Sequence, residues 1–464
     1  MGPTAAAPVA RVSGAAARVG WSATTLATLF AVAVAALAGT VGADDRWAAA
    51  VGRSIVGGAD PDSVPFAAAP SHAWANVPVL SELFSWIVYH ALGLRGLCLA
   101  QTAAVALAFV ALGYAMRRAG ARDAGRGVAI GLVAFGAFGA LAVARLQLFS
   151  LVFFAVMLAI VHADGVSRSR LIWALPPLVA LWANLHGGVL VGVAVAAVYL
   201  LTGRGRSRLR ESVSVLAACG AALFVTPAFL RTPEYFLGVM QSEAARRGAG
   251  MWAPLSASPV GIVLCIAAAA LAVLAWRGRP ARWELIAIAA LAAATVHSAR
   301  TGVWLLMVLA VPAARAFERE QRLRPPAAAA VATLFASLIV VGLVRGPLAS
   351  GATAPLIAAA LQQAHGEPIL AQDVLAEQVA LAGGRVVVGN PLDAFSRPTQ
   401  SAYLDWAAGS VGGDVLLCNA RTVLVHPDTA AAARIAEVGR FRRVRADARS
   451  ILYVAAAAPG RCTG

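Results

Sequence analysis

Long apolar runs, separated by short arginine-rich segments, dominate this chain of 464 residues. A helix needs about 20 apolar residues to cross a bilayer, and somewhat fewer when its flanking side chains reach back to the surface. Hydrophobic residues make up 60% of the chain and charged residues only 13%, whereas a soluble protein carries roughly a quarter charged residues. The sequence therefore predicts a mainly α, polytopic transmembrane protein of about 11 spans. The predicted spans are 19–41, 95–116, 127–144, 148–163, 171–184, 188–202, 212–230, 258–276, 283–298, 301–316 and 326–344.

Arginine determines the predicted orientation of these spans. The net charge of +16 comes entirely from arginine, because the chain contains no lysine. Nucleic-acid binding would require these arginines to gather on one soluble face, so no nucleic-acid partner is expected. By the positive-inside rule the arginine-rich connections are cytoplasmic, and they alternate with connections that lie outside. The cytoplasmic connections are 116–126, 168–170, 204–210, 277–282 and 315–324.

This pattern predicts a multi-pass protein of the cell inner (plasma) membrane. Residues 1–18 are expected to form a cytoplasmic tail, with a cleaved signal peptide as the alternative. Residues 19–345 form the predicted transmembrane domain, which includes a first outer loop at 42–94. An odd number of spans then places residues 346–464 on the extracytoplasmic side.

The composition changes near Gly346, where short β-branched runs bounded by turn residues begin to alternate with helical periodicity. This alternation predicts a small extracytoplasmic α/β domain. Cys418 and Cys462 both fall within it, where a disulfide can form, and two unpaired thiols are the alternative. The predicted strands are 384–390, 414–418, 421–426 and 450–455, and the predicted helices are 373–383 and 429–441.

Polar side chains in apolar surroundings gather on the predicted outer side of the membrane. Asp44 and Asp45 directly follow the first span, and carboxylates there can activate a nucleophile, although a solvated helix end would look the same. Arginine binds phosphate through two hydrogen bonds and keeps its charge, so the outer arginines suit a phosphate leaving group or, alternatively, lipid phosphates. The remaining outer residues are Arg53, Glu82, Arg145, Gln147, Asn184, His186, Arg231, His297 and Arg300.

Several outer stretches occur together: the acidic pair Asp44–Asp45 with GRSIVGGADPDSVPF, Trp74 and Asn76, LSELFSWIVYHALGLRGL, RLQLFS, LWANLHGGVLVG, and NPLDAF…QSAYLDW at 390–406. Together they resemble the GT-C superfamily of integral-membrane glycosyltransferases, most closely bacterial protein-mannosyltransferase-like proteins. The resemblance implies a polyprenyl-phosphate-linked sugar donor and inverting transfer on the extracytoplasmic side. It also implies that an aspartate of the first outer loop is the general base.

The chain departs from the superfamily pattern at two places. A Trp-His pair often follows the first-loop acid, whereas Trp47 is followed here by Ala48. A later outer loop usually carries Glu-Trp, whereas this chain has Met251-Trp252. The assignment of the base therefore depends on the first loop alone.

These observations predict a membrane glycosyltransferase whose partners are the lipid bilayer, a polyprenyl-phosphate sugar and an acceptor in the cell envelope, which is a glycan, a lipid or a protein. Asp44 or Asp45 is the predicted base, and Arg145, Arg231 and Arg300 are the predicted phosphate ligands. No cofactor is expected, and the spacing of the acidic residues does not indicate a metal site. The rest of the predicted pocket is Arg53, Glu82, Gln147, Asn184, His186 and His297.

Two other functions remain open from the sequence. A transporter or flippase of lipid-linked intermediates would favour internal repeats and polar groups at the bilayer midplane. A non-catalytic membrane scaffold would use the outer domain to bind a partner, and its function would not depend on the two aspartates.

Overall fold

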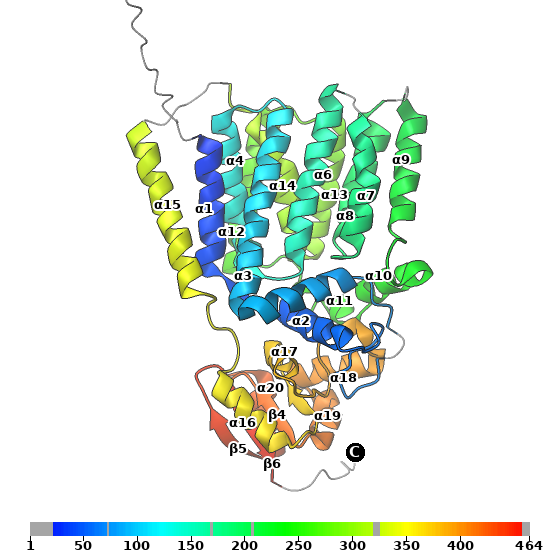
Figure 1. Ribbon diagram of the computed structural model, residues 1–464, viewed down its shortest axis with the longest axis vertical. Helices are drawn as coiled ribbons and strands as arrows, with labels where there is room; N and C mark the ends of the chain where they lie inside the picture. The colour runs from blue at the N-terminus through cyan, green and yellow to red at the C-terminus, as the bar shows by residue number, and fades with distance from the viewer. Residues whose placement is uncertain (1–21, 72–73, 168–169, 206–207, 319–324, 457–464) are drawn as a thin grey trace, which may run out of the picture.

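The computed structural model describes residues 22–456, apart from 72–73, 168–169, 206–207 and 319–324. The predicted tail at 1–18 and the predicted disulfide partner Cys462 lie outside the described residues. A bundle of long helices stands on a smaller C-terminal unit of helices and strands (Figure 1). We call the end of the bundle next to this unit the domain face, and the opposite end the far face.

Apolar helices run between the two faces of the bundle. Among the described residues, α3, α6, α12 and α15 are long and apolar enough to cross a membrane by themselves. The other helices are shorter, so the number of spans stays a prediction. The helices are α1 (Ala23–Ala38), α3 (Val79–Arg118), α4 (Asp123–Gly136), α6 (Gln147–Ser167), α7 (Leu175–Ala183), α8 (Val189–Val198), α9 (Leu209–Ala222), α12 (Pro259–Arg277), α13 (Arg282–His297), α14 (Gly302–Ala314) and α15 (Pro325–Arg345).

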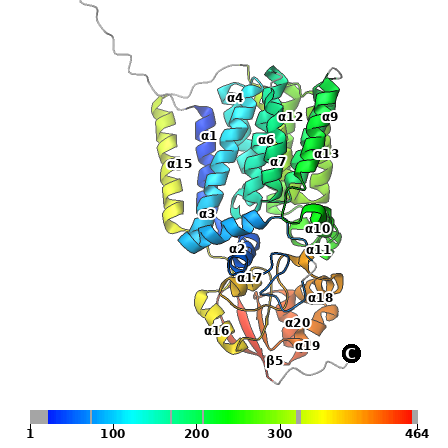
Figure 2. The ribbon, with the colours of Figure 1, turned by 45° about the vertical axis from the view of Figure 1, so that its right-hand side comes forward.

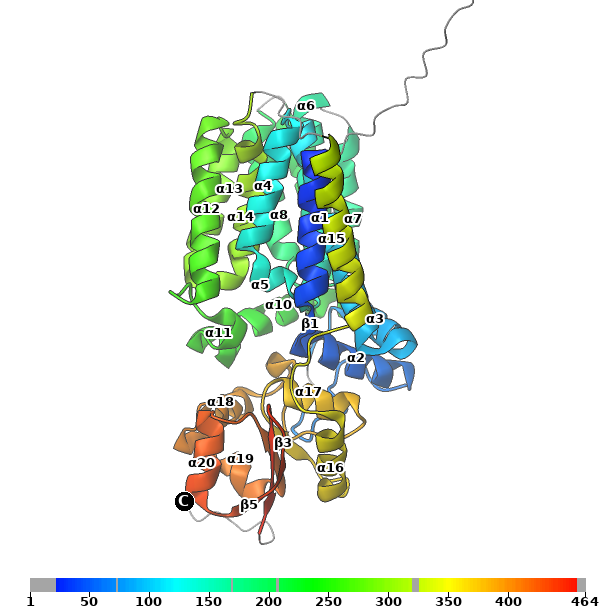
Figure 3. The ribbon, with the colours of Figure 1, turned by 90° about the vertical axis from the view of Figure 1, so that its left-hand side faces the viewer.

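The burial of these helices follows their position in the bundle. Every residue of α14 is buried, whereas α15 buries only Ala328, Ala332 and Gly342. The outer helix α15 packs beside α1 (Figure 3). A Cβ atom on Gly342 would lie 2.5 Å from the carbonyl oxygen of Ala36, so glycine is needed for this close approach.

The predicted span 212–230 is wrong in length. Helix α9 already ends at Ala222, and the segment that contains Thr226 and Pro227 turns away from it. A proline cannot donate the backbone hydrogen bond that a continuing helix requires at this place. The chain then enters the short helices α10 (Thr232–Met240) and α11 (Glu243–Arg247) beside the domain face (Figure 2).

The predicted first outer loop is largely helical, and this corrects the prediction. Helix α2 (Ala43–Val56) and the first part of α3 lie across the domain face (Figures 1 and 2). Gly93, with φ 62°, separates this part of α3 from the part that enters the bundle. A Cβ atom on Gly52 would lie 2.2 Å from the carbonyl oxygen of Glu82, so α2 and α3 pack with their backbones almost in contact. Helix α2 is too short to span a membrane, and its apolar side is buried against neighbouring protein.

A small parallel ladder at the domain face brings two distant segments together. Strand β1 (Thr40–Val41) pairs with β2 (Val143–Ala144), which follows the short helix α5 (Phe138–Leu141). Because β1 precedes α2 and β2 precedes Arg145, this pairing places the start of α2 beside Arg145.

The C-terminal unit contains a four-stranded sheet of order β3-β4-β6-β5, in which β3 and β4 are parallel and the other pairs are antiparallel. One apolar core joins α2 to this unit, since Trp47 and Val51 share it with Leu375 and Val379. The elements are α16 (Ala354–Ala364), β3 (Ile369–Ala371), α17 (Val374–Leu381), α18 (Arg397–Ala407), α19 (Asp414–Asn419), β4 (Thr422–Val425), α20 (Ala430–Val438), β5 (Phe441–Ala446) and β6 (Ile451–Ala455).

Most of the secondary structure expected in this unit is present. Strands β4 and β6 match the predicted strands at 421–426 and 450–455, and α17 and α20 match the two predicted helices. The predicted strand at 414–418 is wrong, because these residues form α19, which buries Leu417 and Cys418. At 384–390 the structure has only isolated bridges from Val386 to Ala67 and Ile369.

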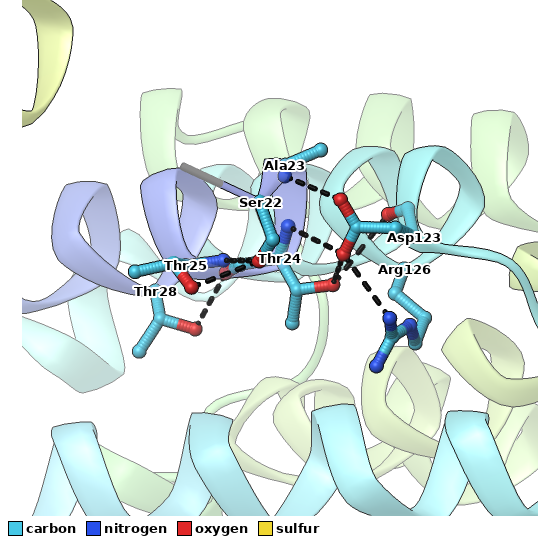
Figure 4. A network of polar contacts seen from close by, with 7 residues as sticks. All are labelled: Ser22, Ala23, Thr24, Thr25, Thr28, Asp123 and Arg126. Carbon is cyan, nitrogen blue, oxygen red and sulfur yellow. Dashed lines mark hydrogen bonds and ion pairs between the residues drawn. The ribbon is translucent and has the colours of Figure 1, made fainter. Parts of the chain in front are cut away.

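At the far face, helix ends are held by charged side chains. Asp123 begins α4 and caps the first turn of α1, where it accepts from the backbone N–H groups of Ala23 (2.6 Å) and Thr24 (3.4 Å) and from the Thr24 hydroxyl (2.6 Å) (Figure 4). Arg126 neutralises the same carboxylate at 3.1 Å. A carboxylate at a helix N-terminus is favourable because it satisfies free N–H groups and opposes the helix dipole.

Candidate functional site

Asp44 and Asp45 lie in the first turn of α2, at the centre of the domain face. The Asp45 side chain is 1% exposed, and neither of its oxygens has a hydrogen-bond partner among the described residues. Asp44 is partly buried, and the indole of Trp47 donates toward its carboxylate.

The two carboxylates differ in their readiness to ionise. Burial raises the pKa of Asp44, but the charges of Arg145 and Arg300 and the Trp47 indole act in the opposite direction. Burial and then the neighbouring Asp44 raise the pKa of Asp45 to about 8. Asp45 therefore keeps a proton at neutral pH, whereas at Asp44 two guanidiniums and an indole oppose the effect of burial and favour the ionised form.

Arg145 and Arg300 reach the pair from two connections that are distant in sequence. Arg145 follows β2, and Arg300 lies in the 3-10 turn η6 (Ala299–Thr301) between α13 and α14. The Arg300 guanidinium carbon lies 4.0 Å from the centre of the Trp252 ring, and Arg145 Nη1 lies 3.2 Å from Met251 Sδ. Within the described part of the chain, neither arginine has a carboxylate at ion-pair distance, so their N–H groups can meet an anionic ligand.

Arg231 is not brought to this cluster. Its guanidinium pairs with Asp62 at 2.8 Å and with Glu234 at 3.1 Å, and it is partly exposed at the start of α10. Two carboxylates already neutralise it, and it does not figure among the charges that act on Asp44 or Asp45. The predicted role of Arg231 as a phosphate ligand therefore lacks geometric support.

Two other predicted pocket residues hold the scaffold around the site. Arg53 donates to the carbonyl oxygens of Ala380 (2.8 Å) and Leu381 (3.0 Å) at the end of α17, which ties α2 to the C-terminal unit. Glu82 is fully buried, and both of its oxygens accept from the Asn76 amide, at 3.0 and 2.8 Å. These contacts fix the two helices that cross the domain face.

The remaining predicted pocket residues lie at the same end of the bundle. Gln147 begins α6 and is partly buried. Asn184 ends α7 and donates to the carbonyl oxygens of Ala180 (2.8 Å) and Val225 (2.5 Å). His297 is exposed at the end of α13.

His186 lies in the turn between α7 and α8. Its Nδ1 is 2.7 Å from Ser150 Oγ and 3.0 Å from the backbone nitrogen of Gly188. Burial, and then the charge of Arg300, lowers its pKa to about 3, so the imidazole is neutral at physiological pH.

The sequence places Tyr235 on the outer side without giving it a role, and it does not single out Asp393. Tyr235 of α10 lies within electrostatic reach of Arg300, Asp44 and Asp393, and burial raises its pKa. Asp393, in the 3-10 turn η7 (Leu392–Ala394), comes from the C-terminal unit and accepts from Trp74 Nε1 at 3.1 Å. Burial raises the pKa of Asp393 as well. The stretch at 390–406, which carries part of the GT-C resemblance, contained the signal that would have found Asp393.

No group of three or more His, Cys, Asp or Glu residues is arranged to hold a metal ion in the described portion of the chain.

No protein-family model matches this sequence, and no curated protein matches it. Solved structures do match its fold. The crystal structure of ArnT from Cupriavidus metallidurans bound to undecaprenyl phosphate is similar with a TM-score of 0.55 and 16% identity, over 94% of this chain and 98% of that chain. The apo structure of the same protein is similar with a TM-score of 0.54 and 16% identity, over 93% and 96% of the two chains. At this identity the likeness establishes architecture, and it extends over almost the whole chain. The chain thus shares the fold of ArnT over almost its whole length.

Proposed function

We propose that this protein transfers a sugar from a polyprenyl-phosphate donor to a cell-envelope acceptor on the extracytoplasmic side of the inner membrane. The observation that carries the proposal is the pairing of an ionisable carboxylate, Asp44, with two guanidiniums, Arg145 and Arg300, that have no ion-pair partner among the described residues. A base beside an anion-binding site is what displacement of a phosphate requires. The undecaprenyl phosphate bound by the similarly folded ArnT supports this donor class.

The reaction is a single displacement at the anomeric carbon. An acceptor hydroxyl oxygen attacks this carbon, and the bond from the carbon to the phosphate oxygen breaks, with inversion. The bonding electrons leave on the lipid phosphate, whose charge Arg145 and Arg300 stabilise. Asp44 takes the proton of the hydroxyl as the new bond forms. Asp45 retains its own proton at neutral pH and does not compete for this one.

The proposed orientation rests on the positive-inside rule. Arginine-rich connections such as 116–126 and 277–282 follow the ends of helices at the far face, which makes that face cytoplasmic. The domain face and the C-terminal unit are then extracytoplasmic. The C-terminal unit would cover the acceptor. Its Asp393 accepts from Trp74 of the first outer segment and acts electrostatically on Tyr235.

The test is release of polyprenyl phosphate by purified protein that receives a panel of polyprenyl-phosphate-linked sugars and envelope acceptors. Asp44→Asn should lower turnover by about 10²–10⁴-fold, the usual contribution of a general base, while folding stays intact. Asp45→Asn is the matched control and should retain most activity at pH 7, because Asp45 is already protonated there.

Other results would contradict the proposal. Movement of a lipid-linked sugar across vesicles without release of polyprenyl phosphate would instead indicate a transporter or flippase. Unchanged function of the Asp44→Asn, Asp45→Asn double variant in cells would indicate a scaffold.

A further inference from the structure

We propose that His186 is a fixed, neutral N–H donor that binds the phosphate of the lipid leaving group through Nε2, and that Ser150, Trp182 and Gly188 hold it in this form. The inference rests on the proposed function, since it names an additional ligand of the same phosphate. Its basis is a chain of hydrogen bonds whose obligatory donors, the Gly188 N–H and the Trp182 indole, favour one assignment of protons.

The proton positions follow from the donors at the two ends of the chain. The Gly188 backbone N–H can only donate, so Nδ1 of His186, 3.0 Å away, must accept. The Trp182 indole N–H can also only donate, so Ser150 Oγ accepts from it at 2.7 Å. The single hydroxyl proton of Ser150 is then free to point at Nδ1, 2.7 Å away. Nδ1 therefore carries no proton, and the proton of the neutral imidazole is on Nε2.

Packing holds this chain of hydrogen bonds rigidly in place. Trp182 is 1% exposed, and Ser150 is completely buried. A Cβ atom on Gly188 would lie 2.6 Å from Ser150 Oγ and 2.9 Å from Nδ1 of His186. A Cβ atom on Gly192 would lie 2.3 Å from the Trp182 ring. The two glycines are therefore needed for α6, α7 and α8 to bring these side chains together.

The fixed tautomer restricts what His186 can do. Its only basic nitrogen is occupied by two donors, so it cannot take the proton of an acceptor hydroxyl. Nε2 remains as a donor. His186 itself lies in a turn whose neighbouring residues belong to the site. Arg300 acts on the ring electrostatically, and Gly187 lies against Tyr235. A donor beside a guanidinium complements an anion, and phosphate is the anion that the proposed reaction supplies.

Two amide substitutions distinguish this role from a purely structural one. The amide nitrogen of glutamine reaches the position of Nε2, whereas that of asparagine reaches only the position of Nδ1. His186→Asn should weaken binding of undecaprenyl phosphate by about 10- to 100-fold, as expected for a lost hydrogen bond to a charged group. His186→Gln should restore binding to within about threefold of wild type. Ser150→Ala should have a smaller effect, because Nδ1 keeps the Gly188 donor.

The measurements are binding of undecaprenyl phosphate and of uncharged undecaprenol to the full-length protein in detergent, with thermal stability of each variant. Only the phosphate-dependent part of the affinity should change, and KM for the donor should rise more than kcat falls. Equal binding by wild type and His186→Asn, or equal losses in the Gln and Asn variants, overturns the inference. So does a loss that undecaprenol shares. Failure of the wild-type protein to bind undecaprenyl phosphate or to turn over any donor would instead overturn the proposed function.

Discussion

The two faces of the helical bundle differ in whether their buried charged side chains have partners. At the far face, Asp164 accepts from Arg204 at 2.9 Å and from the Tyr199 hydroxyl at 2.6 Å. Glu284 accepts from Arg315 at 2.6 Å. At the domain face, Asp45 is buried with no hydrogen-bond partner among the described residues. The far face thus pairs these buried charges. At the domain face Arg231 pairs with Asp62 and Glu234, but among the described residues the aspartate pair, Arg145 and Arg300 form no ion pairs.

This difference separates structural charge from functional charge. A buried ion pair holds two elements in one register, and breaking it is costly because one charge is left uncompensated. An unpaired buried carboxylate does not hold elements together in this way, and its charge is unfavourable away from water. At Asp45 a bound proton removes that charge. Groups that lower stability in this way are expected where a ligand completes the site. The comparison therefore supports a structural role for the charges of the far face and the proposed site at the domain face.

The largest effect should come from breaking a pair at the far face. The Asp164 and Arg204 side chains are 0% and 1% exposed, and among the described residues Asp164→Asn leaves the buried guanidinium with Glu211 as its remaining carboxylate partner. We expect a loss of about 3–5 kcal/mol in the free energy of unfolding, measured in detergent by thermal or denaturant unfolding. The protein that remains folded should keep its kcat. An Asp164→Asn variant that is as stable as wild type but inactive would contradict a purely structural role for the far face.

The next effect concerns Arg300, which has no ion-pair partner among the described residues, and Arg231, which has two. Arg300→Ala removes a guanidinium from the site, and turnover should fall by about 10- to 100-fold, as for a lost charged hydrogen bond. The charge of Arg300 lowers the pKa of Asp44, so its removal raises this pKa and should move the acidic limb of the kcat/KM profile to higher pH. Arg231→Ala is the matched control, because Arg231 is neutralised by Asp62 and Glu234. Equal effects of the two variants on that limb would show that Arg300 has no special relation to Asp44.

The sequence was sufficient to predict the structural features that depend on composition or on short periodic patterns. Apolar runs predicted the long apolar helices, and the resemblance predicted a polytopic helical architecture, which the fold shared with ArnT matches. The same patterns failed where a short run can adopt either structure. Residues 414–418 are apolar enough for a strand, yet they form a helix that buries Leu417 against the core of the C-terminal unit. Helix α2 was read as loop because it is too short to span a bilayer.

The candidate site depends on contacts between segments that are far apart in sequence. Nothing local in Thr40–Val41 or Val143–Ala144 indicates that they pair, yet this ladder brings Arg145 to the aspartates. Arg231 and Arg300 look alike in the sequence, and only the fold shows that Asp62 meets Arg231 at 2.8 Å. The residue types and their gathering at one end of the bundle were therefore predictable, whereas the choice among the arginines was not.

The last prediction tests the unpaired state of Asp45 through pH. The pKa of this carboxyl is raised from 3.8 to about 8 in the folded protein, so the folded state holds the proton more tightly than the unfolded state. Its contribution to stability is complete below pH 4, falls as the pH rises, and is lost above pH 8. Asp45→Asn removes this dependence, so the stability of the variant relative to wild type should rise with pH by on the order of 1 kcal/mol per unit, and then level off.

Unfolding of wild type and Asp45→Asn at several pH values between 5 and 9 measures this difference. The exposed Asp60 provides the control, since Asp60→Asn should show the pH dependence of wild type. A constant difference between Asp45→Asn and wild type across this range would mean that Asp45 is ionised throughout and has a partner. The domain face would then be as fully paired as the far face, and the contrast on which the assignment of the site depends would disappear.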